Sequence, residues 1–142
     1  MTLKIVIAPQ SFKGNISALE AARAIERGVL TAEPDAQTVL APVADGGDGT
    51  LDALVEGTGG QYIRSIVTGP LGQPVEATWG VMGDGRTAVI EMAQASGLAM
   101  VPPRRRNPRI TTTRGTGEII KEALDKGFDH IIVGLGGSAT ND

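Results

Sequence analysis

The hydrophobic and polar positions along the first sixty residues alternate between the periods of strands and helices. A run rich in β-branched residues over 4–8 predicts a strand buried on both faces. The stretch 17–20, Ser-Ala-Leu-Glu, has the form of a capping box, and apolar residues then recur at helical spacing as far as Val29. Residues 38–43 predict a second strand, and a second helix follows the glycine-rich turn over 44–50. This β-α-β-α order favours a parallel sheet.

The middle of the chain has a different pattern. Three strand-like segments follow one another over residues 62–68, 75–82 and 87–92, joined by short turns. The pair Asp84-Gly85 between the last two segments is a typical hairpin signal. Because short connections imply antiparallel neighbours, we expect the architecture to change here.

The last third returns to the α/β pattern. Residues 113–126 predict a helix, residues 130–135 a buried strand, and residues 136–142 form a polar, glycine-rich end. A helix normally follows such a turn, so we expect the chain to be a fragment of a longer protein. The strand over 131–135 would then expose an unpaired edge, which favours self-association.

Composition excludes several classes of protein. The 142 residues carry 13 basic and 16 acidic side chains, a net charge of −3, which is not the basic footprint of a nucleic-acid binder. The single basic run, 104–106, is interpreted as a solvated loop. There is no cysteine, no long apolar span and no secretory signal, so we expect a cytoplasmic protein without membrane contacts.

Polar, glycine-rich turns follow three of the predicted strands, and ligands bind beyond the carboxyl ends of strands in open α/β sheets. These turns offer an ammonium, carboxylates, hydroxyls and backbone amides, which are the groups that phosphoryl transfer requires. Cations and amides would hold the phosphoryl group, carboxylates would hold Mg²⁺, and one carboxylate would accept the proton of the attacking hydroxyl. The predicted catalytic residues are Lys13, Asp45 and Asp142, with Asp45 and Asp48 as metal ligands. The predicted substrate- and phosphate-binding residues are Ser11, Gly46, Gly47, Asp48, Thr50, Gly115, Thr116, Gly136, Gly137, Ser138 and Asn141.

Other interpretations of these residues stay open. Lys13 alone could be a solvated turn residue, and Asp48 or Thr50 could simply cap the second helix. The P-loop motif is absent from the sequence. Residues 134–139 match a relaxed G-x-G-x-x-[GA] fingerprint, which keeps a nicotinamide or flavin protein as a second enzyme class.

At these same turns the sequence resembles the bacterial glycerate kinase family. The matching stretches run in order through the chain: APQSFKG (8–14), VADGGDGT (43–50), VTGPLG (67–72), IEMA (90–93), TTTRGTGE (111–118) and GGSATND (136–142). Two positions depart from the family pattern, because Gln10 stands where Asp is usual and Asp48 where Glu is more common.

The resemblance implies ATP-dependent phosphorylation of D-glycerate to a phosphoglycerate, with ATP and Mg²⁺ as cofactors. It also implies an α/β fold with a flavodoxin-like parallel sheet, helices on both faces, and part of a second lobe with a mixed sheet. Residues 1–60 would begin the flavodoxin-like lobe, 61–108 would form the antiparallel strands of the second lobe, and 109–142 would return to the first. The alternative is a non-catalytic nucleotide- or anion-binding module left by truncation. The product isomer and the oligomeric state stay open.

Overall fold

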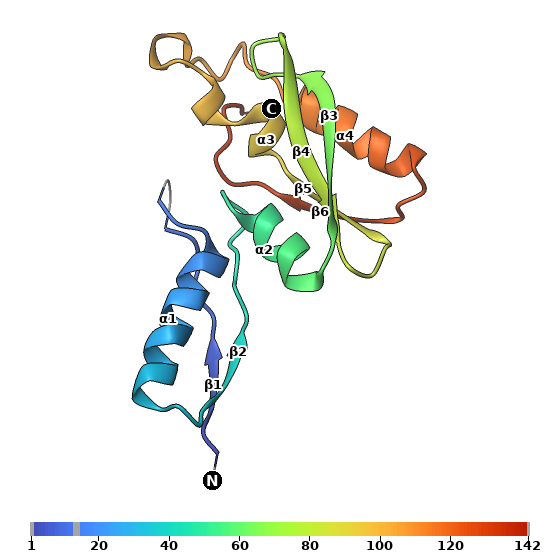
Figure 1. Ribbon diagram of the computed structural model, residues 1–142. Helices are drawn as coiled ribbons and strands as arrows, with labels where there is room; N and C mark the ends of the chain where they lie inside the picture. Colours follow the sequence, from blue (N-terminus) through green and yellow to red (C-terminus); the bar gives the residue numbers. More distant parts are fainter. Residues whose placement is uncertain (1, 13–14, 142) are drawn as a thin grey trace. The chain divides into compact units, whose positions relative to one another are not determined.

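The computed structural model describes residues 2–12 and 15–141, which form two compact units, one up to Ala44 and one from Asp45 onward. The first unit is a β-α-β element. Strands β1 (Lys4–Ile7) and β2 (Gln37–Leu40) pair in parallel, with Val6 opposite Val39, and helix α1 (Ala18–Ala32) connects them. Figure 1 shows α1 running alongside the two strands.

Helix α1 begins where the sequence predicts. The Ser17 hydroxyl accepts a hydrogen bond from the Glu20 amide at 3.2 Å, and the Glu20 carboxylate accepts one from the Ser17 amide at 2.8 Å. This reciprocal pair is the predicted capping box, and it is confirmed. The helix buries its small residues, including Ala18, Ala21 and Ala22.

The second unit is built on a four-stranded mixed sheet of order β3-β4-β5-β6. Strands β3 (Gln61–Thr68), β4 (Pro74–Val81) and β5 (Thr87–Glu91) are antiparallel neighbours, which confirms the predicted change of architecture. Strand β6 (His130–Gly134) pairs in parallel with β5. In the described part of the chain β6 has one hydrogen-bonded neighbour, so it lies at an edge of this sheet, as the sequence predicts.

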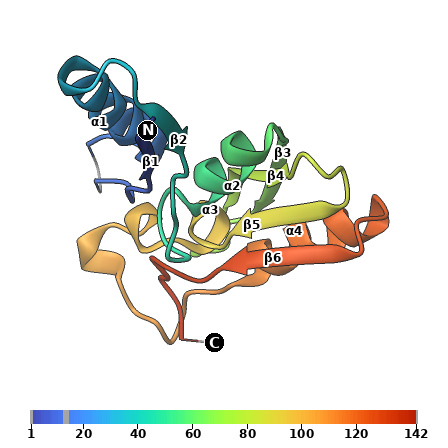
Figure 2. The same ribbon diagram turned by 90° about the horizontal axis from the view of Figure 1, so that it is seen from below.

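A helix packs on each face of this sheet (Figure 2). Helix α4 (Arg114–Asp125) covers one face, where Ile119 and Ala123 pack into the main core around Trp79. Helix α2 (Thr50–Thr58) covers the other face, where its apolar residues pack on Val89. Because side chains alternate along a strand, Glu91 lies on the same face of β5 as Val89, the face that α2 covers.

The connection between β5 and β6 contains elements that the hydrophobic pattern does not reveal. These are the short helix α3 (Ala93–Ser96) and two 3₁₀ turns, η1 (Leu98–Met100) and η2 (Pro103–Arg105). None of the described helices has both the length and the apolar character needed to cross a bilayer.

Within the described residues the fold confirms a mixed α/β protein with a two-stranded parallel sheet and a four-stranded mixed sheet. The described β6 pairs with β5, and the long 92–129 connection between them provides the crossover of a dozen residues or more that parallel neighbours require. The division into 1–60, 61–108 and 109–142 stays a prediction.

Candidate active site

Two of the predicted glycine-rich loops lie against each other in the second unit. The 45–49 loop leads into α2, and the 135–138 loop follows β6. The Gly136 amide donates to the Gly46 carbonyl at 2.7 Å. Two of the turns predicted to bind ligand therefore meet in the second unit.

The contact between the loops requires glycine. A Cβ on Gly136 would lie 2.3 Å from the Gly47 Cα, well inside any normal contact. Gly46 has φ +88°, a left-handed conformation that residues with a side chain rarely adopt. The glycines thus let the two backbones approach each other closely.

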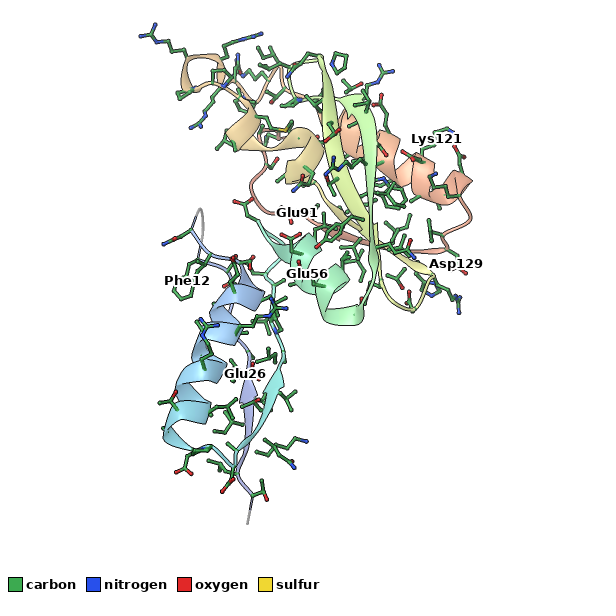
Figure 3. The ribbon with its side chains drawn as sticks, viewed as in Figure 1. Phe12, Glu26, Glu56, Glu91, Lys121 and Asp129 are labelled. Atoms are coloured by element: carbon green, nitrogen blue, oxygen red, sulfur yellow. The ribbon has the colours of Figure 1, made fainter. Side chains whose placement is uncertain are left out.

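Helix α2 is capped by a residue distant in the sequence. Its N-cap, Gly49, has no side chain to offer, and the Thr50 hydroxyl makes no hydrogen bond with a described residue. Instead the Glu91 carboxylate accepts a hydrogen bond from the Leu51 amide at 3.2 Å. Figure 3 shows Glu91 close to the start of α2.

Glu91 is a buried acid, with only 3% of its surface exposed. Burial raises the pKa of its carboxyl group above the ordinary value of 4.5, the Leu51 amide opposes that shift, and the negative charge of Asp48 adds to it. A buried carboxyl with a raised pKa beside a second carboxylate is a frequent feature of functional sites.

A pocket of about 630 Å³ opens beside these groups, within the second unit. Asp48, Glu91 and Gly137 line it, together with Gln94, Met100 and Arg106 from the β5–β6 connection. Its size is within the usual range for small-molecule sites. The pocket therefore brings residues of the two loops, the carboxylates of Asp48, Glu76 and Glu91, and a guanidinium together in one concave surface.

The predicted residues of the 45–49 loop have distinct positions. Asp45 is exposed, and its Oδ1 accepts a hydrogen bond from the Gly47 amide at 2.9 Å, which orders the turn. Asp48 lines the pocket. Thr50 is buried, and its hydroxyl has no hydrogen-bond partner among the residues that the structure describes.

The first turn of α4 is packed into the fold. Thr116 is buried and its hydroxyl lies 2.9 Å from that of Ser96, while a Cβ on Gly115 would lie 2.0 Å from the Thr68 carbonyl oxygen. These contacts give Gly115 and Thr116 a packing role. Their predicted phosphate contacts stay a prediction.

The structure describes some of the remaining predicted site residues and not others. Ser138 and Asn141 are exposed after β6, and the Ser138 hydroxyl accepts a hydrogen bond from the Thr140 amide at 3.0 Å. Ser11 lies in the first unit, partly buried. Lys13 and Asp142 lie outside the described residues.

Asp45 and Asp48 are the residues that the sequence predicts as magnesium ligands. No cluster of three or more His, Cys, Asp or Glu side chains that could hold a metal occurs in the described ranges 2–12 and 15–141. Mg²⁺ in nucleotide enzymes is usually held by one or two protein carboxylates together with substrate phosphates. Asp48 lines the pocket and Asp45 belongs to the same loop, so the two predicted ligands are carboxylates of the kind that such a site uses.

Sequence reasoning missed Glu91 and Arg106. Glu91 stands in the matching stretch IEMA, and a charged residue at the end of the apolar run 88–90 was the available signal. Arg106 was taken with its neighbours as part of a solvated loop. Only its contact with the Val101 carbonyl and its place in the pocket distinguish it.

Comparisons with known proteins cover nearly the whole chain. Residues 5–142 match the sequence model of the Glycerate kinase family. The chain is 63% identical over 140 residues to the glycerate kinase of Bacillus subtilis strain 168 and 57% identical to the glycerate 2-kinase of Escherichia coli K12. Each match covers 99% of this chain and 37% of the relative's length.

The fold is also found in a solved structure. A crystal structure from Salmonella typhimurium LT2, provisionally named glycerate kinase 2, is similar with a TM-score of 0.90 at 57% sequence identity. The similarity covers 99% of this chain and 38% of that one. Both sequence and fold therefore agree on one family.

Proposed function

The chain belongs to the Glycerate kinase family, and we propose that it carries part of the active site of a kinase that phosphorylates D-glycerate with ATP. The observation that carries the proposal is the meeting of the 45–49 and 135–138 loops beside a pocket that holds Asp48 and Glu91. Phosphoryl transfer depends mainly on positioning and on electrostatic stabilisation. The glycine-rich loops supply backbone amides for positioning, and the pocket supplies charged side chains for stabilisation.

We assign roles to the loop residues on that basis. Backbone amides of Gly46 and Gly137 hold phosphate oxygens, because exposed amides of tight glycine loops form anion-binding concavities. The amides of Gly47 and Gly136 donate to the Asp45 carboxylate and the Gly46 carbonyl, so these two glycines shape the loops around the phosphate. Further hydrogen-bond donors to substrate or phosphate come from the side chains of Ser11, Ser138 and Asn141 and from the Lys13 ammonium.

Asp45 and Asp48 would hold Mg²⁺, which when bound neutralises charge on the phosphates and helps to align them. A carboxylate beside the glycerate hydroxyl accepts its proton as the oxygen attacks the γ-phosphorus, and ADP leaves. Asp45 and Asp142 are the predicted residues for that step, and both stand in polar turns that follow predicted strands.

The position of phosphorylation is proposed from a relative. The Escherichia coli protein is named glycerate 2-kinase, and at 57% identity that name favours transfer to the 2-hydroxyl and a 2-phosphoglycerate product. We further propose that residues 1–60 begin a flavodoxin-like lobe, as the parallel β1–β2 pair suggests, and that the enzyme acts in the cytoplasm.

A coupled assay that follows ADP release tests the function. The protein, in the longest form in which it occurs, is mixed with ATP, Mg²⁺ and D-glycerate, with L-glycerate and glycerol as controls. The proposal expects ADP release that depends on D-glycerate. Nucleotide binding without turnover would instead favour the non-catalytic binding module.

Single substitutions then test the roles. Lys13→Ala and Asp45→Asn should each lower turnover by orders of magnitude and leave the fold intact, since both residues are assigned to the reacting groups. Near-normal turnover in either variant would remove that residue from the site.

A further inference from the structure

We propose that Arg106 recognises the carboxylate of the hydroxy-acid substrate and so sets the specificity of the enzyme for an acid over a neutral polyol. The inference rests on the proposed kinase function and names a binding residue in the same pocket. Arg106 is the one cation among the residues that line that pocket, all of which lie in the described part of the chain.

The arginine side chain is anchored. Its Nε donates a hydrogen bond to the Val101 carbonyl at 3.2 Å, and Val101 itself is only 1% exposed. The Val101 amide in turn donates to the Leu98 carbonyl at 3.1 Å. Because one edge of the guanidinium is held by a fixed backbone oxygen, its two terminal nitrogens remain available for a carboxylate, which they fit as a fork.

The guanidinium of Arg106 is also not held by a carboxylate. It forms no ion pair with any residue in the ranges 2–12 and 15–141. The same pocket is lined by the carboxylates of Asp48, Glu76 and Glu91, which would repel an anionic substrate. Among the described side chains that line the pocket, Arg106 is therefore the one whose charge attracts an anion.

Glycerate has the chemistry that such a pocket selects. Its carboxylate suits Arg106, and its hydroxyl groups can donate hydrogen bonds to the acidic residues on the pocket wall. Holding the acid end at Arg106 would present the hydroxyls toward the side that Asp48 and Gly137 line, where the two glycine-rich loops meet. A neutral polyol would lose the charged contact and this orientation.

Arg106→Ala is the direct test, with Arg104→Ala and Arg105→Ala as matched controls from the same basic run. Losing a charge-assisted hydrogen bond should lower kcat/KM for D-glycerate about 10- to 100-fold, mainly through KM, while KM for ATP stays unchanged. Arg106→Lys should fall between wild type and Arg106→Ala, because it keeps the charge and loses the fork. Discrimination between glycerate and the neutral glyceramide should shrink in Arg106→Ala.

Binding of D-glycerate alone, measured by titration calorimetry, separates the inference from the proposed function. If the wild type binds glycerate without phosphorylating it, the kinase proposal fails, and weaker binding by Arg106→Ala still supports the arginine. If the wild type is an active kinase and Arg106→Ala behaves like Arg104→Ala, the arginine assignment is overturned. A rise in KM for ATP alone would overturn it too, because the arginine would then contact nucleotide phosphate. A wild type that neither binds nor phosphorylates glycerate would overturn both.

Discussion

Replacing Gly115 by alanine should lower the free energy of unfolding of the second unit, whereas the same substitution at Gly117 should raise it. Both glycines lie in α4, two residues apart. A Cβ at position 117 would meet no atom within 4 Å, so the substitution there gains helix propensity, about 0.5–1 kcal/mol. A Cβ at position 115 would lie 2.0 Å from the Thr68 carbonyl oxygen of β3.

The helix cannot easily move to relieve that clash. The Glu118 carboxylate accepts hydrogen bonds from the Thr68 amide at 2.7 Å and from the Thr68 hydroxyl at 2.9 Å, which tie α4 to the end of β3. Overpacking against a fixed neighbour costs about 1–3 kcal/mol. After the gain in helix propensity, we expect Gly115→Ala to be about 1–2 kcal/mol less stable than wild type.

Urea denaturation followed by tryptophan fluorescence measures both variants. Trp79 is the single tryptophan of the chain and is fully buried in the core of the second unit, so its signal reports on the part that contains α4. The transition midpoint multiplied by the slope gives each free energy. Equal stability of Gly115→Ala and wild type would refute the packing role. If nucleotide affinity then fell in that variant, Gly115 would belong to an anion site.

Three further predictions concern the site and the core. Gly136→Ala should lower kcat/KM on the order of 100-fold, because a Cβ 2.3 Å from the Gly47 Cα must separate the two loops; unchanged kinetics would show that the loops can shift freely. Glu91→Gln keeps an acceptor for the Leu51 amide and removes a buried charge. Since the pKa of Glu91 is raised in the folded state, its charge destabilises the fold increasingly as pH rises from 4.5 through the raised pKa. The free energy of unfolding of Glu91→Gln should therefore rise relative to wild type across that pH window, and the difference should vanish below it. Urea melts at several pH values measure this difference, and a difference that did not change with pH would contradict the prediction. Ile119→Ala, at a fully buried position, should lower the free energy of unfolding by about 2–5 kcal/mol. Leu124→Ala should lower it far less, because Leu124 on the same helix is 55% exposed. Similar losses of stability for the two variants in thermal melts would mean that α4 packs differently.

Local signals predicted much of the fold. The capping box at Ser17 and the hairpin at Asp84-Gly85 depend on residues close together in the sequence, and both features are confirmed. Pairing of β6 with β5 was not predicted, because it depends on a long connection whose short helix α3 has no periodic pattern.

The candidate site was predicted in part for the same reason. The turns over 44–50 and 136–142 were recognised from glycines and acidic residues, and they meet at Gly46 and Gly136. Glu91 was overlooked because its capping bond to Leu51 spans forty positions of sequence, so no local motif marks it. Arg106 is the same residue type as Arg104 and Arg105, and only its tertiary contact with the Val101 carbonyl distinguishes it.

Phosphorus NMR of the reaction tests the central claim most directly. The protein, in the longest form in which it occurs, is incubated with ATP, Mg²⁺ and D-glycerate, and the proton-coupled spectrum is recorded. The account predicts loss of the ATP γ-signal, growth of ADP and one new phosphomonoester signal that depends on D-glycerate. That signal should be a doublet, because a phosphate on the 2-hydroxyl couples to a single carbon-bound proton, whereas a triplet would indicate the 3-hydroxyl and correct only the product isomer. A spectrum in which inorganic phosphate alone appears, or in which ATP persists beside glycerate, would contradict the assignment as a glycerate kinase.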